Sequence, residues 1–100
     1  MNNYGNLREA IEALQKQGYK LNFKYKKGFV YEPDTNKNYS PVDLQINEFH
    51  RFEGESNPAD MSILYAIETK DGKKGIIAVP YGAYGDGELS EFLRKVQIIN

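Results

Sequence analysis

The chain has 100 residues, of which 40% are hydrophobic and 27% charged, and its formal net charge is -1. These values predict one domain over residues 1–100 and exclude a disordered tail, a collagen-like repeat and a multidomain enzyme. The sequence contains no cysteine, which excludes disulfides, thiolate zinc sites and a cysteine nucleophile. Because it has neither a long apolar run nor a signal-peptide core, we expect a cytoplasmic protein without a membrane partner.

Charge is distributed unevenly along the chain. Residues 16–37 contain six lysines against two acids, whereas residues 38–68 contain six acids against one arginine. Because these two segments oppose each other, the molecule as a whole has no field that would attract a polyanion. Any nucleic-acid role would therefore depend on a local basic patch.

The first predicted element is a helix that begins after Asn6. Its apolar residues recur at helical spacing and share one face: Leu7, Ala10, Ile11 and Leu14. Asn6 and Glu9 are typical of a helix start, and Gly18 is typical of a helix end because it tolerates a left-handed conformation.

The next segment changes to a period of two, which predicts a strand over residues 21–26. Its large apolar side chains alternate with polar ones and share one side: Leu21, Phe23 and Tyr25. Lys27 and Gly28 are expected to end it.

Residues 29–32 and 37–40 flank a turn at residues 33–36 and predict a hairpin. Ser40, Pro41 and Asp43 then predict one helical turn, because they match a cap, a first-turn proline and an acid at the third position.

The second half of the chain predicts three longer strands and a final helix. We expect strands over about 45–52, 62–69 and 74–81, with a loop at 53–60 and a hairpin turn at Asp71 and Gly72. A glycine-rich segment then leads to a helix with one apolar stripe, formed by Leu89, Phe92, Leu93 and Val96. The resulting class is α+β: a two-layer sandwich in which N-terminal and C-terminal helices cover a mostly antiparallel sheet of five to six strands.

The candidate ligand-binding loop lies immediately before that final helix. It consists of tyrosines and glycines, namely Tyr81, Gly82, Tyr84, Gly85 and Gly87. Free backbone N–H groups at a helix start can hold an anion, and glycines allow close approach, although Asp86 would repel one. Ordinary turn chemistry is the alternative interpretation of these glycines.

His50 and Arg51 are the further candidate ligand-binding residues. Glu48 would share a strand face with His50, so an acid/base pair is conceivable, but the sequence offers no nucleophile beside it. The acids and Asn57 of the 53–60 loop lack the spacing of a calcium loop. We therefore expect no catalytic residue, no metal site and no cofactor.

The stretch 19–31 combines lysines with aromatic residues, as single-strand nucleic-acid platforms do. A stacking site needs both kinds of residue on one exposed face, and the alternation over residues 21–26 puts them on opposite faces. We therefore favour a strand with aromatic core contacts and a lysine-guarded edge, and expect no nucleic-acid partner.

One family resemblance rests on short segments spread over most of the chain. They are Asp43, Leu44, Ile46 and Glu48, then Arg51-Phe52-Glu53-Gly54, Asn57-Pro58, Asp60, Tyr65-Ala66-Ile67, Lys74-Gly75 and Tyr81-Gly82-Ala83-Tyr84. With these segments the chain resembles a family of small bacterial proteins, common in Bacteroidetes, that often carries the label phosphoribosylpyrophosphate synthetase. The label implies an enzyme that binds ATP, magnesium and ribose 5-phosphate. Such enzymes place two adjacent acids before a phosphate loop, and no two acids are adjacent in this sequence.

These observations lead to two functional hypotheses. The first is a small non-enzymatic domain that binds a ligand or a protein partner, because eight tyrosines in 100 residues suit contact surfaces. Such a domain could act as a homodimer through a sheet edge or an aromatic patch. The alternative is a protein or enzyme that binds a phosphorylated metabolite similar to phosphoribosylpyrophosphate, as the resemblance implies.

Overall fold

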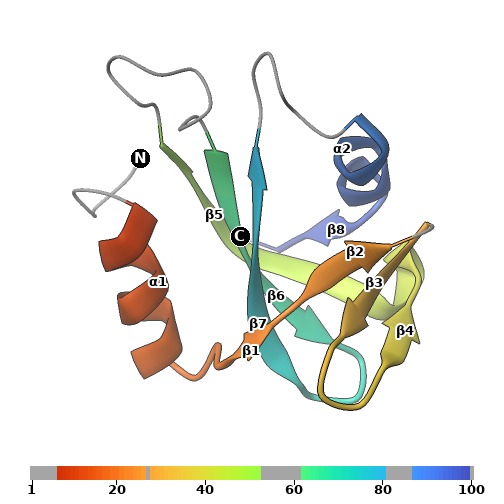
Figure 1. Ribbon diagram of the computed structural model, residues 1–100, viewed down its shortest axis with the longest axis horizontal. Helices are drawn as coiled ribbons and strands as arrows, with labels where there is room; N and C mark the ends of the chain where they lie inside the picture. Colours follow the sequence, from red (N-terminus) through yellow and green to blue (C-terminus); the bar gives the residue numbers. More distant parts are fainter. Residues whose placement is uncertain (1–6, 27, 53–61, 81–86, 100) are drawn as a thin grey trace.

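Figure 1 shows the fold as a computed structural model, which describes residues 7–26, 28–52, 62–80 and 87–99. The described elements, in chain order, are α1 (Leu7–Lys16), β1 (Leu21–Asn22), β2 (Lys24–Lys26), β3 (Phe29–Glu32), β4 (Lys37–Tyr39), the 3-10 helix η1 (Pro41–Asp43), β5 (Leu44–Phe52), β6 (Ser62–Thr69), β7 (Lys74–Pro80), α2 (Gly87–Arg94) and β8 (Gln97–Ile98). They form a five-stranded sheet in the order β1-β7-β6-β5-β8 and a three-stranded sheet in the order β2-β3-β4. None of the described helices has the length and apolar character that a membrane crossing requires.

The centre of the five-stranded sheet is an antiparallel unit of its three longest strands, β5, β6 and β7. The predicted hairpin between β6 and β7 is confirmed, and its turn uses Gly72 at a φ of 89°. The two edge strands are short and parallel to their neighbours, since β1 pairs with β7 and β8 pairs with β5. Strand β8 follows the final helix and was not expected from the sequence.

A β-bulge in β5 changes which face of the sheet its side chains occupy. The register shifts between Ile46 and Glu48. Before the bulge, Leu44 and Ile46 belong to the apolar cluster that also contains α2 residues. After the bulge, His50 pairs with Leu64, which belongs to the cluster around α1. The second half of β5 therefore contributes its inward side chains to the opposite face.

The two helices lie on opposite faces of the five-stranded sheet (Figure 1). Helix α1 packs Ala10 and Leu14 against β6 and β7, whereas α2 and the three-stranded sheet share a second cluster on the other face. The expected α+β class is confirmed, but the layering differs from the expected two-layer sandwich. The reason is that β6 and β7 are apolar on both faces, so that each face requires a cover.

The predicted strand over residues 21–26 is divided at Phe23. The backbone N–H of Phe23 still donates to the carbonyl of Ile76 on β7, at 2.9 Å, and the chain then leaves β7 to form β2. Gly75 makes this crossing possible: a Cβ there would lie 2.6 Å from the Phe23 ring and 2.6 Å from the Leu21 carbonyl oxygen. The three-stranded sheet therefore starts where β7 has no side chain.

Candidate binding face

The three-stranded sheet has one face turned toward the core. Val30 lies at its centre, opposite Tyr25 on β2 and Tyr39 on β4. Val30 is fully buried and Tyr39 nearly so, and the Tyr25 ring meets Phe92 of α2 edge-on with ring centroids 5.7 Å apart. We call these three residues and the buried Glu32 the inner face.

Two turns of defined geometry hold the strands in register. Gly28, with a φ of 87°, lies between β2 and β3. In the predicted β3–β4 hairpin, which is confirmed, the buried Glu32 carboxylate accepts hydrogen bonds from the Thr35 backbone N–H and hydroxyl, both at 2.7 Å. These bonds lower the pKa of Glu32, the Thr35 side-chain bond most, so the carboxylate is ionised at neutral pH.

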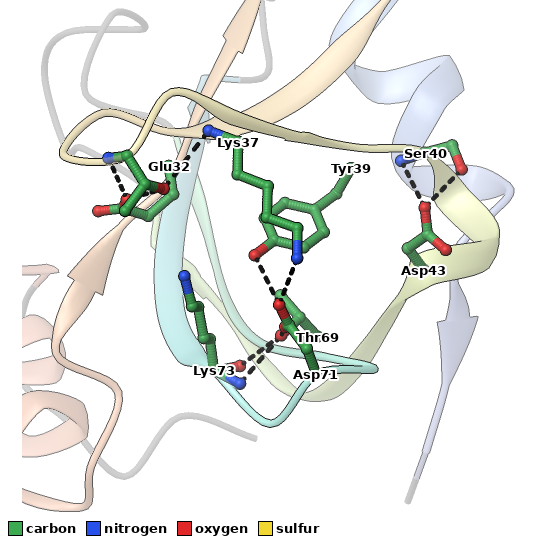
Figure 2. Close-up of polar contacts among 9 residues, drawn as sticks. Glu32, Lys37, Tyr39, Ser40, Asp43, Thr69, Asp71 and Lys73 are labelled. Atoms are coloured by element: carbon green, nitrogen blue, oxygen red, sulfur yellow. Dashed lines mark hydrogen bonds and ion pairs between the residues drawn. The ribbon is translucent and has the colours of Figure 1, made fainter.

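A polar network fastens the sheet to the β6–β7 turn (Figure 2). The Lys37 ammonium donates to Asp71 Oδ2 at 2.7 Å, and the Tyr39 hydroxyl donates to the same oxygen at 3.4 Å. The Thr69 hydroxyl donates to the other oxygen, Asp71 Oδ1, and accepts a bond from the Lys73 N–H at 2.9 Å. Lys37 and then Thr69 lower the pKa of Asp71 from 3.8 to about 2.

A second set of hydrogen bonds joins the three-stranded sheet to the larger sheet at η1, where the predicted helical turn is confirmed. Asp43 Oδ2 accepts hydrogen bonds from the Ser40 N–H at 3.2 Å and the Ser40 hydroxyl at 2.9 Å, which lowers the pKa of Asp43 (Figure 2). The Asp43 carbonyl accepts the Lys70 N–H at 3.0 Å. The three-stranded sheet is thus joined to the larger sheet at both ends of β4.

The outer face of the three-stranded sheet gathers lysines, aromatic rings and an amide. Its members are Lys24 and Lys26 on β2, Phe29 and Tyr31 on β3, and Asn38 on β4. Lys26 pairs with Phe29, and Lys24 pairs with Tyr31. Phe29 is 45% exposed, and a surface hollow of about 460 Å³ is lined by all of these residues except Lys24, together with Asn36.

The expected separation of lysines from aromatic rings is therefore wrong for this sheet. Within β2 the alternation holds, because Lys24 and Lys26 are exposed while Tyr25 faces the core. The β2–β3 register, however, places Phe29 and Tyr31 opposite those two lysines on the same face. The alternation of one strand did not reveal the pairing of two; the signal available was the turn at Gly28, across which Lys26 pairs with Phe29.

The structure does not bring His50 and Arg51 to one site. His50 is buried on the α1 face, and its Nε2 lies 2.9 Å from Glu48 Oε1, so the expected pairing is present. Arg51, the next residue along the strand, points to the opposite face and is exposed.

Of the predicted loop, only Gly87 is described, and it begins α2. It borders an open groove of about 620 Å³, whose lining includes Glu88, Glu91 and Lys95. Two carboxylates against one ammonium make this groove a poor site for an anion. Tyr81, Gly82, Tyr84 and Gly85 lie outside the described residues.

The oxygen-rich loop at 53–60 also lies outside the described residues. Within the described ranges, no group of three histidine, aspartate or glutamate side chains is placed to hold a metal ion.

Comparison with protein-family models gives no match for this sequence, and searches of curated proteins and of solved structures give none either. The family resemblance of the sequence therefore stays a prediction.

Proposed function

We propose that this protein is a small non-enzymatic binding domain and that the outer face of its three-stranded sheet binds an anionic ligand carrying flat rings. The observation that supports this proposal is the pairing of Lys24 and Lys26 with Tyr31 and Phe29 on one exposed surface. Ammonium groups complement negative charge, and exposed rings offer apolar area for stacking.

The carboxylates beside this sheet support a binding role rather than acid/base chemistry. Glu32, Asp43 and Asp71 all accept internal hydrogen bonds, and the pKa of each is lowered. General acids and bases need pKa values near the working pH, and groups held ionised in this way are structural acceptors. Their hydrogen bonds tie the sheet to its own turn and to the β6–β7 turn, and a surface held in place before binding loses less entropy on binding.

The proposal is tested by thermal-shift measurements and amide NMR titrations with phosphoribosylpyrophosphate, nucleoside monophosphates, sugar phosphates and short oligonucleotides. We expect saturable amide shifts centred on Lys24, Lys26, Phe29, Tyr31 and Asn38, without turnover of the compound. Shifts centred on Arg51 and Gly87, or conversion of a sugar phosphate, would instead support the phosphorylated-metabolite alternative.

A sizing column completes this test. A homodimer through an aromatic patch, one of the two dimer modes that the sequence allows, would use the same rings, so a stable dimer that dissociates when Phe29 is replaced would contradict a ligand-binding role for this face.

A further inference from the structure

We infer that the ligand of the outer face is single-stranded nucleic acid, with bases stacked on Phe29 and Tyr31 and phosphates held by Lys24 and Lys26. This inference rests on the proposed function, because it names the ligand class for the same surface.

The spacing of the two rings suits successive bases of an extended strand. Phe29 and Tyr31 are two residues apart on β3, so their Cα atoms are about 6.8 Å apart and their side chains share one face. Each ring can therefore take a different base. Stacking on exposed rings tolerates any base, because every base has a π-face.

Each ring has a lysine beside it, just as each base of a nucleic acid has a phosphate beside it. Each ring has one lysine directly opposite it on the neighbouring strand, Lys26 beside Phe29 and Lys24 beside Tyr31. Opposed side chains in an antiparallel pair have Cβ atoms about 5 Å apart, which places one ammonium beside each stacked base. On the other side of Tyr31, Asn38 offers an amide that can both donate to and accept from a base edge.

Charge on this face favours a polyanion. The acids of the three-stranded sheet and its β3–β4 turn, among the described residues, are Glu32 and Asp34. Glu32 points to the core and is 2% exposed, and Asp34 lies in the turn beyond the strands. The two lysines are therefore not opposed by a carboxylate on the strands of the face itself.

The open shape favours a single strand over a duplex. A duplex conceals the faces of its bases, whereas an exposed sheet with aromatic rings stacks bases that are already unpaired. A hollow of about 460 Å³ lies within the range of small-ligand sites, so the face can hold a short stretch of bases.

The experiment is fluorescence anisotropy with a labelled octathymidylate and the full chain. We expect Phe29→Ala and Tyr31→Ala each to weaken binding by about tenfold, while Tyr31→Phe keeps it, because stacking needs the ring and not the hydroxyl. Phe49→Ala is the matched control, since Phe49 is 48% exposed on the other sheet, and it should leave binding unchanged.

The lysines are tested by salt dependence. Two phosphate contacts predict a slope of about -1.4 for the logarithm of the binding constant against that of the salt concentration, and Lys24→Gln or Lys26→Gln should each reduce it by about 0.7. Lys20→Gln, which removes an exposed lysine outside this sheet, should not change the slope.

Two further probes separate this inference from the proposed function. If an abasic strand of the same length binds as tightly as octathymidylate, and Lys24→Gln weakens both, the base-stacking inference fails while an anion-binding face stands. Equal affinity for a duplex would also overturn the inference. If neither an oligonucleotide nor any compound of the metabolite panel perturbs the face, both proposals fail.

Discussion

The two faces of the three-stranded sheet are built from alternate residues of the same strands, yet their environments are opposite. Val30 on the inner face is fully buried, whereas its neighbour Phe29 on the outer face is 45% exposed. On the inner face the one carboxylate, Glu32, is satisfied by internal hydrogen bonds. On the outer face, lysines and rings meet solvent. Side chains one position apart on these strands therefore pack in the core on one face and, in the proposed function, contact the ligand on the other.

An exposed phenylalanine adds little to stability, since its ring buries only part of its area. Large apolar groups at the surface that join a patch with charged residues commonly mark interaction sites. The inner face, by contrast, needs its volume filled, because core packing is dense and a cavity cannot collapse completely. Substitutions on the inner face should therefore lower stability, whereas substitutions on the outer face should weaken binding and leave stability nearly unchanged.

The largest effect is expected for Val30→Ala, which removes two methyl groups from a fully buried site. We expect a loss of about 2–3 kcal/mol in the free energy of unfolding, from lost transfer energy and a residual cavity. Urea denaturation measures this directly. Val42→Ala is the control, because Val42 is 71% exposed and its replacement should change stability by less than about 0.5 kcal/mol. Equal effects at the two positions would show that the inner face is not a core.

The second largest loss of stability is expected at Gly75, where the chain crosses from β7 to the three-stranded sheet. Gly75→Ala would place a Cβ 2.6 Å from both the Phe23 ring and a backbone oxygen, and overpacking of this kind costs about 1–3 kcal/mol. Thermal denaturation monitored by circular dichroism measures the change. Gly87→Ala is the matched control, because no atom lies within 4 Å of the added Cβ. A neutral Gly75→Ala would contradict the close crossing.

A smaller effect on stability is expected from a change of pH, because Asp71 joins the three-stranded sheet to the β6–β7 turn through hydrogen bonds. The pKa of Asp71 is depressed to about 2 in the folded protein, so its ionised form stabilises the fold above its ordinary pKa of 3.8. That contribution is lost as the pH falls from about 4 toward 2. Asp71→Asn should therefore flatten the dependence of stability on pH in this range. An NMR titration of the Asp71 carboxyl carbon with a midpoint near 3.8 would contradict the network.

The smallest change in stability is expected on the outer face. Phe29→Ala and Tyr31→Ala should each alter the free energy of unfolding by no more than about 0.5 kcal/mol, because they remove partly exposed rings without opening a cavity. Paired measurements of urea denaturation and octathymidylate binding check this expectation. A loss of stability as large as that of Val30→Ala would remove the distinction between the faces.

Local patterns in the sequence were sufficient for most elements. The helical spacing before Gly18, the turn residues after Glu32 and the dipeptide Asp71-Gly72 each specify local geometry, and the structure confirms an element at each place. Such signals are local because a turn or helix end depends on the backbone freedom of a few residues.

The features that the sequence did not predict depend on contacts between distant segments. The split at Phe23 arises because the chain leaves β7 after the Phe23 bond to Ile76 and pairs with β3 instead, and β8 exists because Gln97 and Ile98 meet β5 after the final helix. The layering of the helices depends on which face of the central sheet each helix reaches.

The candidate site shows the same division between local and distant information. Alternation indicated correctly that Lys24 and Lys26 point away from the core. It could not show that the rings of the next strand join them, because that result depends on the pairing register. His50 and Arg51, both candidate ligand-binding residues, lie on opposite faces of β5, since consecutive strand residues alternate.

The most direct test compares the aromatic rings of the two faces within one experiment. In an NMR titration of the full chain with octathymidylate, we expect the ring protons of Phe29 and Tyr31 to shift upfield in a saturable manner. The chemical shifts of the ring protons of Tyr25 and Tyr39, on the inner face of the same sheet, should stay unchanged. Binding that shifts the inner rings equally, or leaves the Phe29 and Tyr31 rings unmoved, would contradict the account.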